Sequence, residues 1–343
     1  MFVAFGVCAS SNVATAQTNE SLVPLIQAFD NFDFQGIFVK TEQMPVVSDL
    51  AITRDKTTMY VGCDDQRVYR CNLKTKEIKQ AFQRADDWVR AVAVSPTSNE
   101  VAVLSQKGRL SVWDSQTESR LREIDAGVVG ARALAYSPNG KVIAVGSFNA
   151  TVNMFDASTL QKLAGWSAPG ESSTAISFSP DGSLLALGGR DGIVRVWTTF
   201  NGKKLYDLPL TNVDGGKSRR VRAVAFSPDG TRIAAGGDAD QIVLWELSSG
   251  KQVGSLYLSE GKVFSLVFCG VDRLVSGDSC NLVRFWDATN QSQIARSMLP
   301  ADRNEFRLGH KGTVSVLKYV EDGTSGYILS GSFDTTVKMW KLP

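Results

Sequence analysis

The stretch from Thr174 to Trp197 reads TAISFSPDGSLLALGGRDGIVRVW, and it decides the fold. Ala175 to Phe178, Leu184 to Leu187 and Ile193 to Trp197 are short apolar or alternating runs, each of the length of a β-strand. The segments between them, SPDG and GGRDG, are turn sequences rich in Gly, Pro and Asp. A three-stranded unit of this size cannot bury both of its faces alone. We therefore expect copies of the unit to pack against one another, as in a repeat protein.

The position of Trp197 recurs along the chain at nearly regular intervals. Seven equivalent strand ends are separated by 42, 42, 42, 48, 41 and 54 residues: Cys71, Trp113, Phe155, Trp197, Trp245, Trp286 and Trp340. The turn that begins Ser-Pro also recurs in phase, at 95–96, 137–140, 179–182 and 227–230. Seven phased units in 343 residues predict one domain built from seven similar sheets.

A period near 42 residues, with Gly-rich turns and a terminal Trp, resembles the WD-repeat (tryptophan–aspartate repeat) family of β-propellers. Trp113-Asp114 and Trp286-Asp287 keep the dipeptide that names the family. The resemblance covers roughly residues 33 to 342 and implies an all-β fold, a single seven-bladed β-propeller of four-stranded antiparallel blades. It also implies a non-catalytic protein-interaction scaffold that binds a partner on the top face, around the central channel.

The last unit lacks a fourth strand of its own, because the sequence has only three residues after Trp340. Counting back from the strand near Val47, by the spacing between Phe82 and Arg90, places a strand at Phe34 to Lys40. We expect this strand to pair beside residues 335–341, because a ring left open exposes an unpaired strand edge. The propeller then spans residues 34–343, and residues 17–33 form a short helix or an extended arm in front of it.

Residues 1–16 end in Ala14-Thr15-Ala16, a small-x-small pattern that precedes many signal-peptide cleavage sites. The segment lacks the basic residues that begin a signal peptide, so the alternative is a disordered or mis-started N-terminus. A signal peptide implies export to the periplasm or the outside, and its absence implies a cytoplasmic protein. The five cysteines fit no metal or haem spacing and do not indicate the compartment.

The overall charge gives no support for a nucleic-acid partner. The formal net charge is +2, and no apolar run approaches the ~18 residues that suggest a membrane helix. We therefore expect a protein partner, no nucleic acid and no membrane insertion, with a monomeric propeller acting within a complex. The loops at 214–219 and 300–308 lengthen their repeats beyond the common period and are further candidate contact sites. The alternative is that they are insertions tolerated at the surface without a function.

The sequence offers no set of residues typical of catalysis. His310 is the only histidine, so neither a histidine-based triad nor a multi-histidine metal site can be assembled. We expect no enzyme activity, no cofactor and no bound metal. The alternative is an exported bacterial propeller that binds a small molecule, or has hydrolase or redox activity, in its central channel.

His310 has a structural explanation in the family resemblance. His310, Ser330, Asp334 and Trp340 match the positions of a hydrogen-bonded tetrad in WD-repeat proteins that keep the full pattern. A buried imidazole is stable only when its nitrogens are satisfied, and these neighbours can satisfy them. Lys107 and Cys280 replace the turn acid in blades 2 and 6, so those blades lack this anchor.

The innermost strands align without gaps and contain two apolar columns, one at Leu50 and its equivalents and one at Ile52 and its equivalents. Two residues before Leu50, the apolar rule stops, and the column is Ser48, Arg90, Arg132, Thr174, Arg222, Phe264 and Ser315. We predict that this end of the strands forms a face for a partner with acidic groups, through Trp88, Arg90, Arg132, Arg219, Arg220, Arg222, Lys262 and Phe264. The alternative is that each arginine pairs with a turn acid of its own blade, such as Asp86, Asp87 or Asp240.

Overall fold

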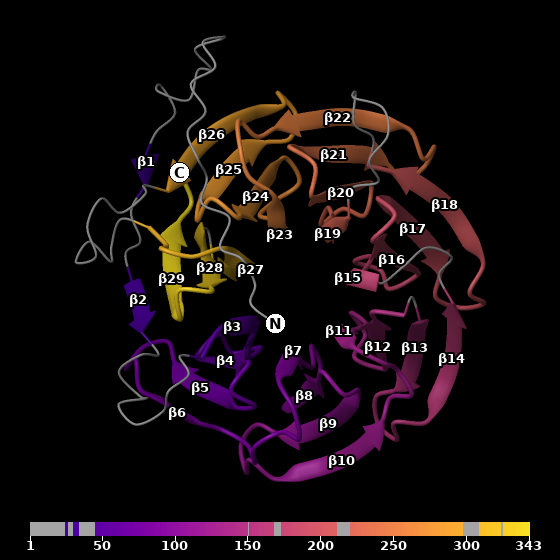
Figure 1. The fold of residues 1–343 in the computed structure, drawn as a ribbon, viewed down its shortest axis with the longest axis vertical. Coiled ribbons are helices and arrows are strands. Elements are labelled where there is room, and N and C mark those ends of the chain that lie inside the picture. The colour runs from indigo at the N-terminus through magenta and orange to yellow at the C-terminus, as the bar shows by residue number, and fades with distance from the viewer. Residues whose placement is uncertain are drawn as a thin grey trace.

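The computed structural model describes residues 25–26, 30–33, 45–149, 151–167, 173–210, 220–297, 309–323 and 325–343. These residues form 29 strands and no helix, arranged as seven sheets. Figure 1 shows the sheets as the blades of one ring, with the strands β3, β7, β11, β15, β19, β23 and β27 nearest its centre. The predicted seven-bladed propeller is confirmed. Because the described part of the chain has no helix, it has none that is long and apolar enough to cross a membrane.

Within each blade the strands follow one another antiparallel from the centre outward. Blades 1 to 3 contain β3 (Val47–Ile52), β4 (Thr58–Cys63), β5 (Val68–Asn72), β6 (Ile78–Gln80); β7 (Val89–Val94), β8 (Glu100–Ser105), β9 (Arg109–Asp114), β10 (Arg120–Asp125); and β11 (Ala131–Tyr136), β12 (Val142–Ser147), β13 (Thr151–Asp156), β14 (Lys162–Ser167). Blades 4 and 5 contain β15 (Ser173–Phe178), β16 (Leu184–Gly189), β17 (Ile193–Thr198), β18 (Lys204–Pro209); and β19 (Val221–Phe226), β20 (Arg232–Gly237), β21 (Gln241–Glu246), β22 (Gln252–Tyr257). Blades 6 and 7 contain β23 (Val263–Phe268), β24 (Arg273–Asp278), β25 (Val283–Asp287), β26 (Ser292–Ser297); and β27 (Val314–Asp322), β28 (Ser325–Ser332), β29 (Thr336–Lys341).

The recurring SPDG turn forms for a local reason. The Ser179 hydroxyl donates to the Asp181 carboxylate at 2.5 Å and accepts the N–H of Leu184 at 2.9 Å. Asp181 also accepts the N–H of Ser183, and Gly182 supplies a backbone φ of +74° that residues with a Cβ rarely adopt. The turn thus satisfies its own backbone donors and reverses the chain from β15 into β16.

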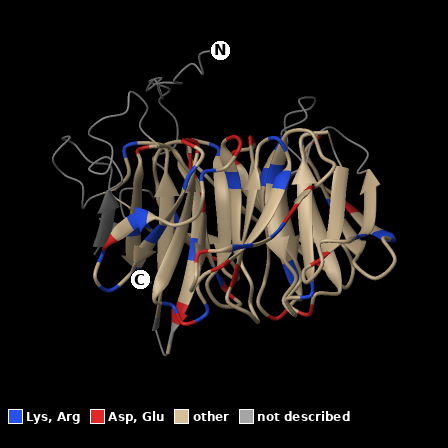
Figure 2. Cartoon of the chain, turned by 90° about the horizontal axis from the view of Figure 1, so that it is seen from below, with Lys and Arg blue, Asp and Glu red and all other residues tan. Residues whose placement is uncertain are grey.

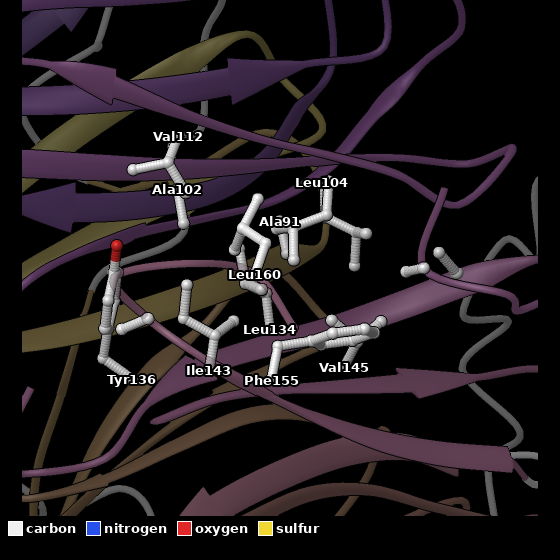
Figure 3. Packing of buried hydrophobic residues seen from close by; sticks show 14 of the residues in the cluster. Ala91, Ala102, Leu104, Val112, Leu134, Tyr136, Ile143, Val145, Phe155 and Leu160 are labelled. Atoms are coloured by element: carbon white, nitrogen blue, oxygen red, sulfur yellow. The ribbon is translucent and has the colours of Figure 1, made fainter. Parts of the chain in front are cut away.

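The hydrophobic core lies between blades rather than inside them. Seven buried apolar clusters occupy the seven interfaces, and each joins the facing surfaces of two neighbouring sheets. Figure 3 shows the cluster between blades 2 and 3, where Leu104 and Val112 of one blade meet Leu134, Ile143 and Phe155 of the next. Burial of each such side chain contributes about 1.5–3 kcal/mol, so a blade becomes stable only between its neighbours.

The N-terminal segment closes the ring, as expected, but by a different strand. β2 (Asp30–Asp33) pairs antiparallel with β29, with Phe32 opposite Val337, and supplies the outer strand of blade 7. The prediction of Phe34 to Lys40 was therefore wrong in position, and residues 34–44 lie outside the described residues. The count assumed that the connection into β3 has the same length as the one into β7. The actual connection is longer, because β2 ends at Asp33 and β3 begins at Val47, whereas β6 ends at Gln80 and β7 begins at Val89.

A second short strand precedes β2 and reaches the neighbouring blade. β1 (Leu25–Ile26) pairs in parallel with β26, with Leu25 opposite Arg296, so blade 6 has five strands. The segment before the propeller is thus extended in its described part. Its two strands cover the outer edges of blades 6 and 7, on one side of the seam (Figure 1).

Blade 6 contains a buried ion pair in place of the expected turn acid. Arg284 Nε donates to Asp278 Oδ2 at 2.8 Å, and both side chains are fully buried. Asp278 also accepts the backbone N–H groups of Cys280 and Leu282, while Trp286 Nε1 donates to the Ser276 hydroxyl. The anchor that Cys280 cannot provide is therefore provided two residues earlier in the same turn.

Candidate functional site

The residues that interrupt the apolar columns occupy one special backbone position in all seven blades. The pairing of the innermost strand with its neighbour skips one residue in every blade, for example between Val89 and Ala91. The skipped residues are Ser48, Arg90, Arg132, Thr174, Arg222, Phe264 and Ser315, the predicted column. A β-bulge of this kind leaves its residue outside the regular pairing and turns the side chain away from the sheet. The column thus surrounds one end of the channel.

Aromatic rings hold the arginines at this end of the ring. The guanidinium of Arg90 lies 4.9 Å from the centre of the Trp88 ring, and that of Arg222 lies 4.4 Å from the Phe264 ring. Arg132 lies 5.3 Å from the ring of Phe148. Such contacts are favourable and leave the edge of the guanidinium free to donate hydrogen bonds. Trp88 is 40% exposed and Phe148 38% exposed, so these pairs form part of the surface.

The alternative of pairing with turn acids applies to one of the three bulge arginines. Arg222 Nε lies 2.6 Å from Asp238 Oδ1, an acid other than the expected Asp240. Arg90 donates to the uncharged amide oxygen of Gln106, at 2.9 Å from Nε. Arg132 has no hydrogen-bond or ion-pair partner among the described residues. Arg90 and Arg132 therefore have no ion pair with a carboxylate of the described residues, although the charges of Asp64 and Asp87 act on Arg90 and oppose the lowering of its pKa by burial and by Arg132.

The arginines are close enough to oppose one another's charge. Burial lowers the pKa of Arg132, and the neighbouring charge of Arg222 lowers it further. Burial and the charge of Arg222 lower the pKa of Arg220 in the same way, against the effect of Asp238. The Nε of Arg220 is buried without a hydrogen-bond partner among the described residues. We call Arg90, Arg132, Arg190, Arg220 and Arg222 the arginine cluster.

The structure adds residues that the sequence interpretation missed. Phe148 also lies near Arg190, at 6.0 Å, and Phe264 meets Phe333 edge to face at 6.3 Å. Gln106, Phe148 and Asp238, which contact the bulge arginines of their own blades, each follow the arginine by 16 residues. This fixed offset from the bulge column, into the next hairpin turn, is the signal that could have identified them.

Of the other predicted contact residues, the structure describes some and leaves others outside its described part. Lys262 lies 4.0 Å from Asp238 and so near Arg222. Arg219 and the loops at 214–219 and 300–308 lie outside the described residues. The structure thus places Trp88, Arg90, Arg132, Arg220, Arg222, Lys262 and Phe264 at one end of the ring, and binding by this face stays a prediction.

The four side chains of the expected tetrad form one hydrogen-bonded chain in blade 7. Trp340 Nε1 donates to Ser330 Oγ at 2.7 Å, and Ser330 lies 2.6 Å from His310 Nε2. His310 Nδ1 lies 3.0 Å from Asp334 Oδ2. Asp334 also accepts the N–H of Lys311 at 2.7 Å, which ties the incoming loop to the turn. The imidazole is fully buried, and both of its nitrogens have partners.

The tetrad keeps its histidine uncharged. Burial lowers the pKa of His310, although the Asp334 carboxylate opposes this. Burial alone would raise the pKa of Asp334, but its hydrogen bonds with His310 and Thr336 hold it well below the usual range. The neutral imidazole then donates from Nδ1 to Asp334 and accepts the Ser330 proton at Nε2.

We expect His310→Ala to lower the free energy of unfolding by about 1–3 kcal/mol at pH 8, because buried partners lose their hydrogen bonds. The difference in unfolding free energy between the wild type and the variant should become smaller as the pH falls through about 6.5. At that pH the histidine of the unfolded wild type becomes protonated, whereas the folded one, whose pKa is lowered, stays neutral, so the wild type loses stability. Urea titrations of both proteins at pH 8 and 5.5 measure this. His310→Ala at wild-type stability would contradict the structural role.

The described residues contain no group of three or more His, Cys, Asp or Glu side chains that could hold a metal ion. Models of known protein families match three stretches of the chain. Residues 28–164 match a nucleolar protein 10-like N-terminal domain, and residues 176–271 match the WD40 domain of anaphase-promoting complex subunit 4. Residues 303–341, which contain the tetrad, match the G-beta repeat of the WD domain. No curated protein matches the chain significantly.

Proposed function

Since the chain belongs to the WD-repeat family, we propose that it is a non-catalytic protein-interaction scaffold whose partner binds at the arginine cluster. Family membership supports the class of function, because WD-repeat propellers generally bind other proteins. The position of the site rests on one observation of this chain, the bulge column with its paired arginines and aromatic rings.

The chemistry of the arginine cluster favours a partner with acidic groups. Arg and aromatic side chains are the residue types that most often dominate binding energy at protein interfaces. Here the rings pre-orient the guanidiniums, which reduces the side-chain entropy lost on binding. A carboxylate that entered between Arg132, Arg220 and Arg222 would also relieve their mutual repulsion.

Charge reversal tests this proposal. We expect the triple variant Arg90→Glu, Arg132→Glu and Arg222→Glu to fold but to lose at least tenfold in affinity, about 1.4 kcal/mol, for partners captured by the wild-type protein. The measurement is a quantitative pull-down with mass spectrometry, followed by titration of each captured protein at two salt concentrations. Wild-type affinity should fall as salt rises, since the interaction depends on charge.

Lys and Arg residues lie at both ends of the ring (Figure 2), so the matched control changes the same number of charges on the opposite face. Lys141, Lys203 and Lys251 are exposed and follow turns at the other end of the ring, so their replacement by Glu should leave capture unchanged. Equal capture by the folded arginine variant and by the control would show that the partner binds elsewhere.

A further inference from the structure

A pocket with a volume of about 480 Å³ opens between blades 1 and 2, away from the arginine cluster. Its walls come from three turns, at Arg54, at Ser98 and Asn99, and at Ser115 and Gln116. These turns follow the innermost or third strands, so they lie at the opposite end of the ring from the bulge column. The volume lies within the ~300–1,000 Å³ that is usual for small-ligand sites. We call this space the interblade pocket.

The interblade pocket exists where blade 1 departs from the repeat. Tyr60 of β4 pairs with Arg70 of β5 in the middle of the blade and lines the pocket. The six other blades place a small or aliphatic residue opposite an apolar one at this position: Ala102 and Val112, Ala144 and Met154, Ala186 and Val196, Ala234 and Leu244, Val275 and Phe285, Leu329 and Met339. All twelve are at most 6% exposed, whereas the Arg70 side chain is 31% exposed.

The charge of Arg70 does not serve the core of the propeller. An arginine at this position costs desolvation that the apolar residues of the six other blades avoid. Arg70 has one carboxylate partner, with 2.9 Å between its Nη1 and Glu118 Oε1. Its other nitrogens have no partner among the described residues. Tyr60 packs in the core between blades 1 and 2, with its ring stacked on Phe82, so the charge of Arg70 is the part of the pair that packing leaves unexplained and that points to a binding role.

Several hydrogen-bonding side chains in the rest of the pocket wall are not used by the fold. The side chains of Ser98, Asn99 and Gln116 have no hydrogen-bond partner among the described residues. Arg54 is exposed and, within the same part of the chain, also without an ion-pair partner. The one acid in the wall, Asp55, is occupied by the hydroxyls of Thr53 and Thr57, and these bonds lower its pKa.

We propose that the interblade pocket binds a phosphate monoester between Arg54 and Arg70. Two guanidiniums and several amide and hydroxyl donors suit the three terminal oxygens of a phosphate, which accept more hydrogen bonds than a carboxylate can. The phosphate is carried either by a small molecule or by a phosphorylated side chain of a peptide. The site is separate from the arginine cluster and does not depend on the function proposed for it.

Isothermal titration calorimetry of the full chain tests the site with three probes: inorganic phosphate, glycerol 3-phosphate and a short peptide that contains phosphoserine. We expect at least one of the two esters to bind, and the unphosphorylated peptide not to bind. Tighter binding of glycerol 3-phosphate assigns the site to a small molecule, and tighter binding of the phosphopeptide assigns it to a protein ligand.

Two variants connect the binding to the pocket. Arg70→Met introduces a residue that blades 3 and 7 already carry in this position, at Met154 and Met339, so the blade should fold. We expect Arg70→Met and Arg54→Ala each to weaken the binding at least tenfold. The control Arg120→Ala removes an exposed arginine of blade 2 that pairs with Glu123, outside the pocket, and should bind as the wild type does.

Either of two results would overturn the proposal. One is the absence of binding by both esters to the wild-type protein at millimolar concentration. The other is unchanged binding by the folded Arg70→Met variant, which would place the anion at another basic surface. The charge-reversed arginine cluster should leave this binding intact, so a failure here is distinguishable from a failure of the proposed scaffold function.

Discussion

The variant Asp278→Ala is expected to lose about 3–5 kcal/mol of its free energy of unfolding, because it removes the carboxylate that pairs with the buried charge of Arg284. Both side chains of this pair are fully buried, with 2.8 Å between Nε and Oδ2. The substitution also removes the acceptor of the Cys280 and Leu282 N–H groups, which close the turn between β24 and β25. Urea denaturation monitored by tryptophan fluorescence measures the loss.

Two control proteins distinguish the buried charge from a general effect of losing an ion pair. Arg120→Ala breaks an exposed pair with Glu123 and should cost at most about 1 kcal/mol. The double variant Asp278→Asn with Arg284→Met keeps an oxygen that can accept from the turn and removes both charges, so it should recover most of the stability. An unfolding free energy of Asp278→Ala within experimental error of the wild-type value would contradict this explanation of blade 6.

Deletion of residues 1–33 is expected to destabilise the ring by about 2–4 kcal/mol, through the loss of the hydrogen bonds between β2 and β29. The deletion also uncovers the edge of β29, and an uncovered edge promotes association between molecules. Thermal unfolding and light scattering measure the two effects. The variant should melt at a lower temperature and form larger particles.

The matched control is deletion of residues 1–24, which keeps both β1 and β2. This variant should have the same melting temperature as the full-length chain, because the residues that pair with the propeller, Leu25–Ile26 and Asp30–Asp33, are still present. Equal melting temperatures for the two truncated proteins would mean that β2 does not hold the seam closed.

The sequence predicted the parts of the fold that repeat. The spacing of Trp197 and its equivalents predicted the number of blades, and the gapless column at Leu50 predicted residues of the core between the blades. The closing strand was misplaced because its connection occurs once and has no second copy to fix its length. In blade 6 the column showed Cys280 where an acid was expected, but the neighbouring Asp278 performs the same bonding from a different position.

For the candidate site, the sequence predicted the residues but not their contacts. The residues of the bulge column were found, because the apolar pattern stops at Arg90 and its equivalents. Their contacts were not found, since Gln106, Phe148 and Asp238 belong to hairpin turns that share no residue type. The pair of Tyr60 and Arg70 was not identified from the sequence, and the structure shows that it lines a pocket.

Because of the bulge that recurs in every innermost strand, the residue at the channel mouth can change during evolution without changing the pairing that the blade needs in order to fold. Each bulge residue lies outside the regular pairing of its blade, so its replacement changes the surface at the mouth of the channel while the cross-strand bonds stay in place. Duplication of a blade therefore adds one further replaceable position at the mouth of the channel. Serine, arginine and phenylalanine already occupy equivalent bulge positions in this chain, so the position accepts side chains of different size and charge within the same ring.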